Sequence, residues 1–466
     1  MKKQLLVLFL LTLSFHAWSQ DSLVLGFKEY LGYVKKYHPV VKQANLTIDM
    51  AQANVMKARG GFDPKVEVDY GRKQFKGSEY YDLLNATFKI PTWYGIELKA
   101  NFEQNEGEFV NPERFVPDEG LYSAGVSVSL GQGFLMNKRM ATLKKAKFFR
   151  EQTAAEQEIL VNEVLYEASL AYFKWLRAYN EVEVFDDILT NALQRFNGVK
   201  RSAEVGDRAT IDTVEAKISY QNRSLGLEQA KVKFMKRSLE LSNFLWLQDN
   251  IPLELQPGVV PSDDIETEID ATLNVTGTPL SEFTLETHPK LRSLDRKIDG
   301  LKIDRRLKGN RLLPVVDLNY NFITATPEIG NSFNTGEYKG GLRFAMPLFL
   351  RKERGEYKLA RLKVTDAEYE RTTTELSLQN KITALYNELD SFEIQNRLIA
   401  DIVINYEKLL NAEERKFSFG ESSIFLVNSR EQNLIESRLK QLEIQNKFLD
   451  TKARLFNTLV LPAENL

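Results

Sequence analysis

The sequence predicts a mixed α and β membrane protein that is built from two internal repeats, with long helices following short β-hairpins. Three observations predict this fold class. Two stretches of 64 residues, 134–197 and 356–419, contain neither glycine nor proline. Such lengths are far beyond those of ordinary globular helices. Segments in which apolar and polar residues alternate with period two, the pattern of β-strands, precede each stretch. Finally, similar residues recur at an offset of 250 positions.

The N-terminus, residues 1–19, has the features of a secretory signal peptide. Lys2 and Lys3 precede a mostly apolar run at 5–13, and Ala17-Trp18-Ser19 places small residues at the two cleavage positions. A membrane anchor is the alternative, but the apolar run is short for a membrane span. We therefore expect the mature chain to leave the cytoplasm.

The composition argues against several kinds of chemistry. The chain has no cysteine, which removes disulfides, thiolate metal sites, cysteine nucleophiles and lipid attachment to an N-terminal cysteine. The net charge of −2 does not favour a nucleic-acid partner, because proteins that bind nucleic acid carry a basic stripe. Apart from His16 in the signal, the histidines are His38 and His288, which we interpret as structural residues at equivalent helix starts. Neither a catalytic triad nor a phosphate-binding loop is present. We predict no enzyme, no cofactor and no metal site.

The first repeat, residues 20–250, is expected to contain helices, strands at about 65–130 and a long helical hairpin at about 134–250. The expected elements are helices 25–37 and 39–59, strands 65–70, 84–90, 96–102 and 122–130, a long helix from 134 and a return helix at 210–247. The long helix ends at Asn197-Gly198 or a turn or two later at Val205-Gly206. A segment with four prolines, 251–287, links the two halves.

The second repeat, residues 288–466, begins the pattern again. At the offset of 250, His288-Pro289 matches His38-Pro39 and Tyr320 matches Tyr70. We expect strands at about 314–347 and a second long helical hairpin at about 355–460.

The strands predict that several copies share one barrel. Each strand has one apolar and one polar face, which suits a soluble sandwich or a transmembrane barrel. Lipid permits no open sheet edge, and the four to six strands of one chain are fewer than the eight of the smallest single-chain barrels. Aromatic residues near the strand ends fit an interfacial belt; they are Tyr80, Tyr81, Trp93, Tyr94 and Tyr122.

This duplicated order of helix, hairpin, long helix and return helix, with His-Pro near each repeat start and glycine at each helix tip, resembles the TolC-like outer membrane efflux channel family. The resemblance covers essentially the whole mature chain. It implies a homotrimer in the cell outer membrane that extends into the periplasm. Four strands per subunit would form a twelve-stranded transmembrane β-barrel, continued by a long periplasmic α-helical barrel. The implied partners are outer membrane lipid, a periplasmic adaptor protein and an inner membrane pump.

The resemblance also implies a function. The chain would export small molecules such as drugs, metals or other toxic compounds as the exit duct of a tripartite efflux pump. A related alternative is an exit duct for type I protein secretion. An alternative from another class is a periplasmic coiled-coil scaffold or adaptor without a pore. The sequence does not choose the transported substrate.

The helix tips carry the site residues that the resemblance implies. The family's turn Val-Gly-x-x-x-x-x-Asp fits 205–212, and the second tip at 419–426 keeps the glycine. The expected adaptor contacts are Val205, Gly206, Asp207, Arg208 and Thr210 in the first tip and Phe419, Gly420, Glu421 and Ser422 in the second.

The same comparison places Asp212, Phe417 and Leu426 at the periplasmic pore constriction. Leu426 stands where the best-known member type has a gate aspartate, and Phe417 stands where a hydrogen-bonding tyrosine is expected. Asp212 is therefore the carboxylate that we place near the constriction. Its alternative role is a helix N-cap or a first-turn acid that complements the helix dipole.

The first half departs from the resemblance at an additional hairpin, Leu84 to Phe102, which has no counterpart in the second half. We expect this hairpin to lengthen an extracellular loop or to elaborate the rim. The alternative is that it adds strands to the barrel.

Overall fold

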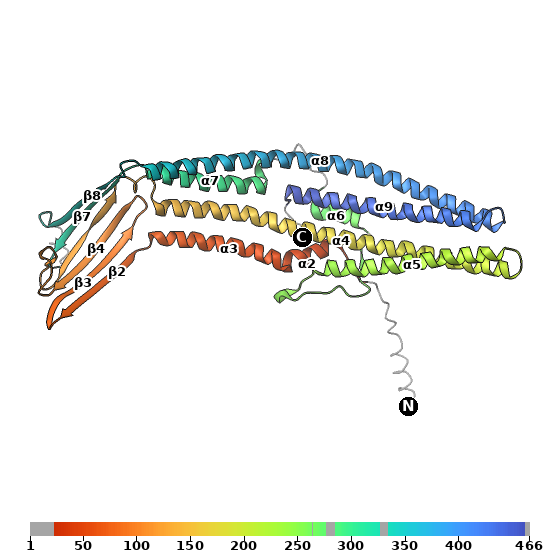
Figure 1. The fold of residues 1–466 in the computed structure, drawn as a ribbon, viewed down its shortest axis with the longest axis horizontal. Helices are drawn as coiled ribbons and strands as arrows, with labels where there is room; N and C mark the ends of the chain where they lie inside the picture. The colour runs from red at the N-terminus through yellow and green to blue at the C-terminus, as the bar shows by residue number, and fades with distance from the viewer. Residues whose placement is uncertain (1–22, 263, 276–284, 327–333, 462–466) are drawn as a thin grey trace, which may run out of the picture. The chain divides into compact units, whose positions relative to one another are not determined.

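The computed structural model describes residues 23–262, 264–275, 285–326 and 334–461 (Figure 1). The predicted signal peptide lies outside these residues. The chain divides into two compact units, one of residues 1–43, 160–283 and 380–466 and the other of residues 44–159 and 284–379. Helices α3 (Pro39–Arg59), α4 (Lys138–Glu204) and α8 (Arg351–Ser418) contribute residues to both units.

The second of these units contains a six-stranded antiparallel sheet (Figure 1). Its strands, in spatial order, are β2 (Lys65–Phe75), β3 (Ser78–Pro91), β4 (Ile96–Glu106), β5 (Leu121–Ser129), β7 (Val315–Thr324) and β8 (Tyr338–Ala345). Each neighbouring pair is antiparallel, so the edge strands β2 and β8 run in opposite directions. Among the described residues, neither edge strand has a second neighbour.

The hairpin of β3 and β4 corrects our expectation for the segment from Leu84 to Phe102. The segment is neither a loop nor a rim, because β3 pairs with β2 and β4 pairs with β5 inside the sheet. Its period-two alternation continues that of both neighbours. The turn between the two strands requires glycine at Gly95, where φ is +69° and an added Cβ would lie 2.6 Å from the carbonyl oxygen of Gly133.

Helices pack against one end of this sheet, the end that contains the β3–β4 turn. They are the later part of α3, the 3₁₀ turn η1 (Gly60–Phe62), the first part of α4, helix α7 (Pro289–Asn310) with the turn η5 (Leu285–Thr287), and the first part of α8. Met136, Met140 and Ile303 are buried together, and Trp93 from the β3–β4 turn packs against them. The Trp93 ring also stacks on Phe62 at 5.3 Å between centroids. Trp93 therefore belongs to the helix core and not to a surface belt.

The other unit is built on helices. It includes the early part of α3 and the later parts of α4 and α8. Its own helices are α2 (Phe27–Tyr37), α5 (Thr210–Ser242), α6 (Ile265–Leu273) and α9 (Ile424–Leu459). It also contains the turn η3 (Gln248–Asn250) and a short parallel pair of strands, β1 (Val24–Leu25) and β6 (Val260–Pro261). Its core is aromatic. The ring centroids of Phe27 and Tyr172 are 5.3 Å apart, and those of Tyr172 and Trp175 are 5.5 Å apart. The tyrosine hydroxyl donates to the carbonyl oxygen of Leu25.

The helix ends follow simple local chemistry. Helix α4 passes through Gly198 and ends before Gly206, so the later of the two predicted ends is correct. At the start of α7, Nδ1 of His288 accepts a hydrogen bond from the backbone N–H of Lys290 at 3.0 Å, which is a helix-capping role. In the described part of the chain, no helix combines the length and the hydropathy that crossing a membrane requires.

Candidate functional site

One face of the sheet is apolar across all six strands. Residues that lie opposite one another share a face, and the register places Val68, Ala86, Phe102, Tyr122 and other apolar residues on one side. These side chains are not covered by the chain itself: Val66 is 71% exposed and Leu342 is 68% exposed. Exposed apolar areas of this extent mark an interaction surface.

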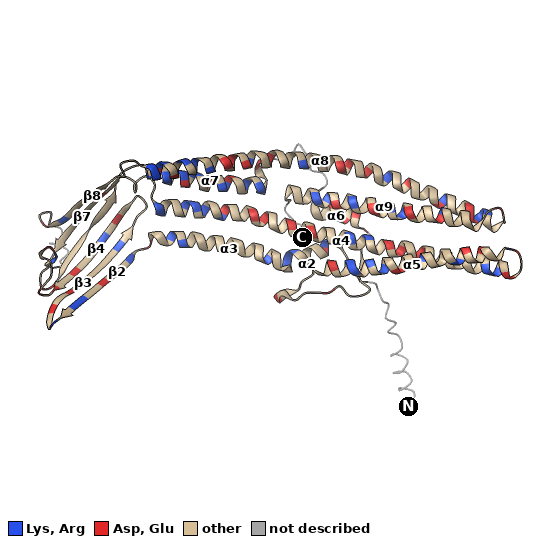
Figure 2. Cartoon of the chain, in the orientation of Figure 1, with Lys and Arg blue, Asp and Glu red and all other residues tan. Residues whose placement is uncertain are grey.

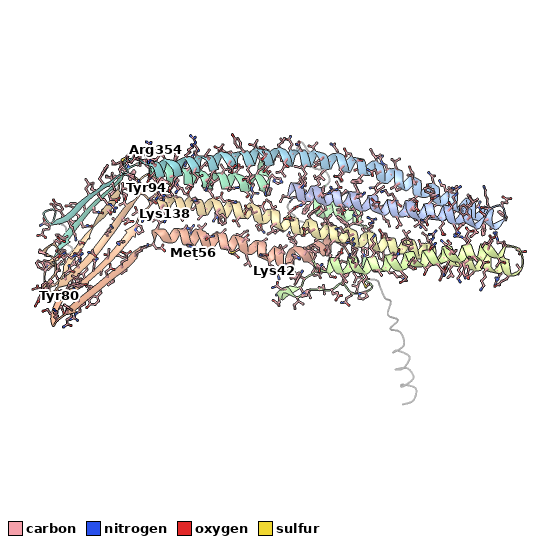
Figure 3. All side chains as sticks on the ribbon, in the orientation of Figure 1. Lys42, Met56, Tyr80, Tyr94, Lys138 and Arg354 are labelled. Carbon is pink, nitrogen blue, oxygen red and sulfur yellow. The ribbon has the colours of Figure 1, made fainter. Side chains whose placement is uncertain are left out.

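Two tyrosines mark the ends of this sheet. Tyr80 lies at the end remote from the helices, and Tyr94 lies at the end next to them (Figure 3). Tyr94 is 60% exposed. Tyrosines at both ends of an apolar band are typical of proteins in a membrane, where their rings lie at the two interfaces.

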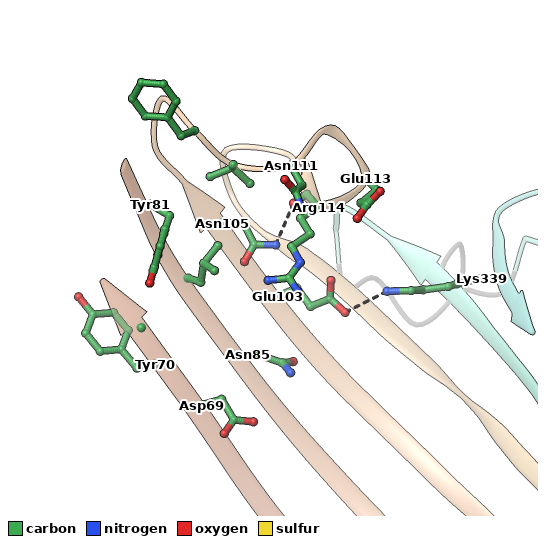
Figure 4. A pocket seen from close by; sticks show the side chains of 14 residues that line it. Asp69, Tyr70, Tyr81, Asn85, Glu103, Asn105, Asn111, Glu113, Arg114 and Lys339 are labelled. Atoms are coloured by element: carbon green, nitrogen blue, oxygen red, sulfur yellow. Dashed lines mark hydrogen bonds and ion pairs between the residues drawn. The ribbon is translucent and has the colours of Figure 1, made fainter. Parts of the chain in front are cut away.

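The opposite face of the sheet is polar and charged. Lys89 pairs with Glu67 on the neighbouring strand, and Ser129 donates a hydrogen bond to Asp317 at 2.6 Å. At the end remote from the helices, a cavity of about 820 Å³ opens between this face and the β4–β5 loop, which carries the turn η2 (Pro112–Arg114). Asn105 donates to the carbonyl oxygen of Arg114, and Lys339 pairs with Glu103 at 3.3 Å (Figure 4).

The helix tips of the other unit have matching backbone geometry. Gly206 has a φ of +86° and Gly420 a φ of +76°, which are conformations that favour glycine. After each glycine, a backbone N–H bonds five residues back: Asp207 to the oxygen of Ser202, and Glu421 to the oxygen of Lys416, both at 2.9 Å. This is the Schellman arrangement, which ends a helix sharply.

The structure brings the two predicted tips together. Buried Val199, Ala216 and Ile424 form one apolar cluster, and Phe417 packs against it. Arg208 of the first tip donates a hydrogen bond to the carbonyl oxygen of Phe417 at 3.0 Å. The tips therefore form one surface that is made from the ends of α4, α5, α8 and α9.

Several predicted tip residues point away from this cluster. Val205 is 68% exposed and Phe419 is 73% exposed, and Thr210, the first residue of α5, is also exposed. Ser422 donates from its hydroxyl to Glu413 at 2.5 Å. The tips thus present apolar side chains to the surroundings.

Asp212 and Leu426, which we predicted to lie at the constriction, are in the first turns of α5 and α9. The N-cap of α5 is Ala209, so the N-cap alternative for Asp212 is wrong, and its first-turn alternative agrees with its place. A carboxylate there complements the positive end of the helix dipole. The N-cap of α9 is Ser423, whose hydroxyl accepts from the backbone N–H of Leu426 at 3.3 Å.

A buried charge network near the tips was not predicted from the sequence. Glu431 on α9, 2% exposed as a side chain, accepts from Arg195 of α4 at 2.9 Å and from Arg223 of α5 at 3.2 Å. Arg195 also pairs with Glu414 of α8 at 2.7 Å. Burial acts to lower the pKa of Arg195, but Glu431 and Glu414 raise it overall. These ion pairs thus join four helices.

Comparison with known proteins identifies a family model that matches residues 280–459, described as outer membrane efflux protein. No curated protein has significant sequence similarity to the chain. The family match confirms the resemblance to TolC-like outer membrane efflux channels.

Solved structures agree with this match. CusC superposes with a TM-score of 0.68 at 12% identity, covering 93% of this chain and 91% of that one. The open state of the Neisseria gonorrhoeae MtrE outer membrane channel gives 0.66 at 12% identity, covering 93% and 88%. The Campylobacter jejuni CmeC outer membrane channel gives 0.65 at 13% identity, covering 93% and 85%. At these identities the structures show a shared fold.

Proposed function

We propose that this chain, whose second half matches the outer membrane efflux protein family, is the outer membrane exit duct of a tripartite efflux pump. One observation carries the proposal: a single antiparallel sheet with a continuous, exposed apolar face across six strands. In water such a face would be covered by another layer or would drive aggregation. In hydrocarbon it needs no cover, provided that the sheet closes on itself.

The even number of strands allows the sheets of several copies to close into one barrel. Because β2 and β8 run in opposite directions, β8 of one copy can pair with β2 of the next, and the ring remains antiparallel throughout. Head-to-tail contacts of this kind form closed rings. Three copies, as the resemblance implies, would give eighteen strands from three six-stranded sheets, in place of the twelve expected from the sequence. Barrels of about this size leave an aqueous channel.

The helices continue this channel. Three copies of the long helices, packed around one axis, would make a tunnel in the periplasm, and the barrel would lie in the outer membrane. The division of the chain into a signal peptide at 1–19, two repeats and a linker remains a prediction. The role is transport, with no reaction catalysed by the chain.

The tips supply the contact with the rest of the pump. Exposed apolar residues such as Val205 and Phe419 suit a periplasmic adaptor that docks onto the helix ends. Asp212, Phe417 and Leu426 remain our proposal for the constriction. The energy for export would come from an inner membrane pump that the adaptor joins to the duct.

Small molecules such as drugs or metals are the proposed cargo, and protein export by type I secretion uses the same kind of duct. A periplasmic scaffold without a pore is the alternative from another class. The exposed apolar face of the sheet argues against the scaffold, since a water-soluble protein would have to cover that face.

Extraction and conductance test the proposal. The full chain, expressed with its signal, should need detergent for extraction, have the mass of a trimer in detergent and conduct ions in a planar bilayer. A monomer that stays soluble without detergent and never conducts would support the scaffold instead.

A further inference from the structure

One row of residues on the polar face of the sheet is rich in lysine. The register of the strands aligns Lys65, Lys89, Lys99, Gly125, Asn321 and Lys339 as successive partners on β2, β3, β4, β5, β7 and β8. Four of these six positions are lysine and none is acidic. Directly opposite side chains have Cβ atoms about 5 Å apart, and like charges at that distance destabilise a sheet. This lysine row therefore has an energetic cost.

The cost is only partly offset by carboxylates. Lys89 pairs with Glu67, and Lys339 pairs with Glu103. Lys99 and Lys65 make no ion pair with any residue that the structure describes. Glu67 also interacts electrostatically with Lys65 and Lys99, so its single negative charge is shared among three lysines and the row keeps a net positive charge.

A cavity of about 420 Å³ adjoins the row at the end of the sheet next to the helices. The charged residues of its wall are Lys99, Lys138, Arg139, Arg343, Glu97 and Asp317. Arg139 pairs with Glu97 at 2.6 Å, and Asp317 accepts a hydrogen bond from Ser129. Within the described residues, Lys99, Lys138 and Arg343 make no ion pair, although Asp317 is the cross-strand partner of Arg343.

Helix α4 adds positive charge beside the cavity, part of which Asp304 of α7 offsets through its ion pair with Lys145 at 3.2 Å. Figure 2 shows Lys and Arg gathered where α4 and α8 begin, and Lys138 lies at the start of α4 beside the sheet (Figures 2 and 3). Lys138, Arg139, Lys144, Lys145, Lys147 and Arg150 in the first turns of α4 are all basic, with no acid among residues 138–150. The cavity thus lies in a region of positive potential.

We infer that this cavity and the lysine row form a binding site for small anions that carry phosphate or carboxylate groups. Lysine ammonium groups and the planar guanidinium of Arg343 are the donors that bind such oxyanions in proteins. The volume is in the range of ligand pockets. This inference rests on the proposed function, in which the polar face of the sheet lines the pore. The duct would hold anionic solutes on their way through the barrel.

Inorganic pyrophosphate is the probe for the test, and the purified full chain in a planar bilayer is the assay. Pyrophosphate added on the extracellular side should block the current. In the double variant Lys99→Gln/Arg343→Gln, the half-blocking concentration should rise roughly tenfold or more, since two favourable charges are lost. The variant Lys99→Arg/Arg343→Lys keeps both charges and should keep the block.

The matched control is Lys73→Gln/Lys76→Gln, which removes one charge at the remote end of β2 and one in the turn that follows, and it should leave the block unchanged. Equal loss of block in this control, or no block of the wild type, would overturn the anion site while the conducting channel stands. Thermal stabilisation by pyrophosphate in detergent separates the two proposals. Stabilisation of the wild type but not of Lys99→Gln/Arg343→Gln, without any conductance, would support the site and contradict the duct.

Discussion

Nη2 of Arg208 donates to the carbonyl oxygen of Phe417 at 3.0 Å, and the guanidinium carbon lies 3.8 Å from the centre of the Phe417 ring. The two residues are 209 positions apart in the sequence and belong to different helix tips. A cation over an aromatic face is attracted by the ring quadrupole. Phe417 thus joins the tips through its ring and its backbone, at a position where the resemblance implies a tyrosine hydroxyl.

Because Phe417 belongs to the proposed pore constriction, removing the contact that holds it should favour the open channel. Arg208→Ala loses a hydrogen bond from a charged donor and a cation–π contact, together about 1–2 kcal/mol, or roughly 5- to 30-fold in an equilibrium constant. The fraction of time spent conducting in planar bilayers should rise accordingly. Arg201→Ala, at an exposed position in the last turn of α4, is the control and should behave as wild type. Identical open fractions in Arg208→Ala and wild type would contradict a role in closure.

Glu431→Ala should destabilise the helical hairpins strongly. The variant leaves Arg195 and Arg223 nearly buried without the carboxylate that they share, and removing one partner of a buried ion pair costs about 3–5 kcal/mol. Thermal unfolding followed by circular dichroism measures the loss. Glu228→Ala removes an exposed pair with Lys231 and should change stability by less than about 1 kcal/mol. Equal melting temperatures for the two variants would show that the buried network contributes no more to stability than an exposed ion pair.

Stability should depend on pH through Asp450. Burial raises the pKa of this carboxyl to about 6, against the opposing charges of Lys174, Arg454 and Arg177. The pKa of an aspartate in an unfolded chain is about 3.9. The folded state therefore binds the proton more tightly, so the ionised carboxyl destabilises the fold above pH 6, and this penalty is lost as the pH falls from about 6 to 4.

Asp450→Asn should consequently melt at a higher temperature than wild type at pH 7.5 and at the same temperature near pH 4. The control has the opposite sign: hydrogen bonds from Lys447 and Lys440 lower the pKa of Glu443 to about 2, so Glu443→Gln should not raise the melting temperature at pH 7.5. A constant difference between Asp450→Asn and wild type at every pH would refute the titration.

The tip glycines test the adaptor contact. Valine at Gly206 or Gly420 would have to adopt a positive φ, which is costly for a β-branched residue, although an added Cβ meets no atom within 4 Å. We expect Gly206→Val and Gly420→Val to impair efflux and adaptor binding while the trimer still inserts. Gly198→Ala, inside α4, should be neutral or slightly stabilising. Normal efflux by both valine variants would remove the tips from the adaptor contact.

Local patterns in the sequence predicted the long helices and the sheet strands, but not helix α6, which lies in the segment we interpreted as an irregular link. The absence of glycine and proline predicted α4 and α8, and the alternation predicted all six strands. What it could not provide was pairing: β3 and β4 have the same alternation as a rim or a loop hairpin would have, and only the register shows them inside the sheet. Glu431 was missed for a similar reason. A glutamate on a long helix usually lies on a solvated face, and its burial depends on the arginines of two other helices.

The most direct test of the account is whether β8 of one copy lies beside β2 of the next. Because the native chain has no cysteine, every disulfide can be assigned to introduced residues. A cysteine at Phe344 on β8, combined in turn with cysteines at Val66, Val68 and Tyr70 on β2, reports the contact on a non-reducing gel. Leu318→Cys with Leu342→Cys, direct partners within one sheet, is the positive control. The account predicts a covalent trimer for at least one combination. Efficient formation of the control disulfide with no cross-link between copies would contradict it.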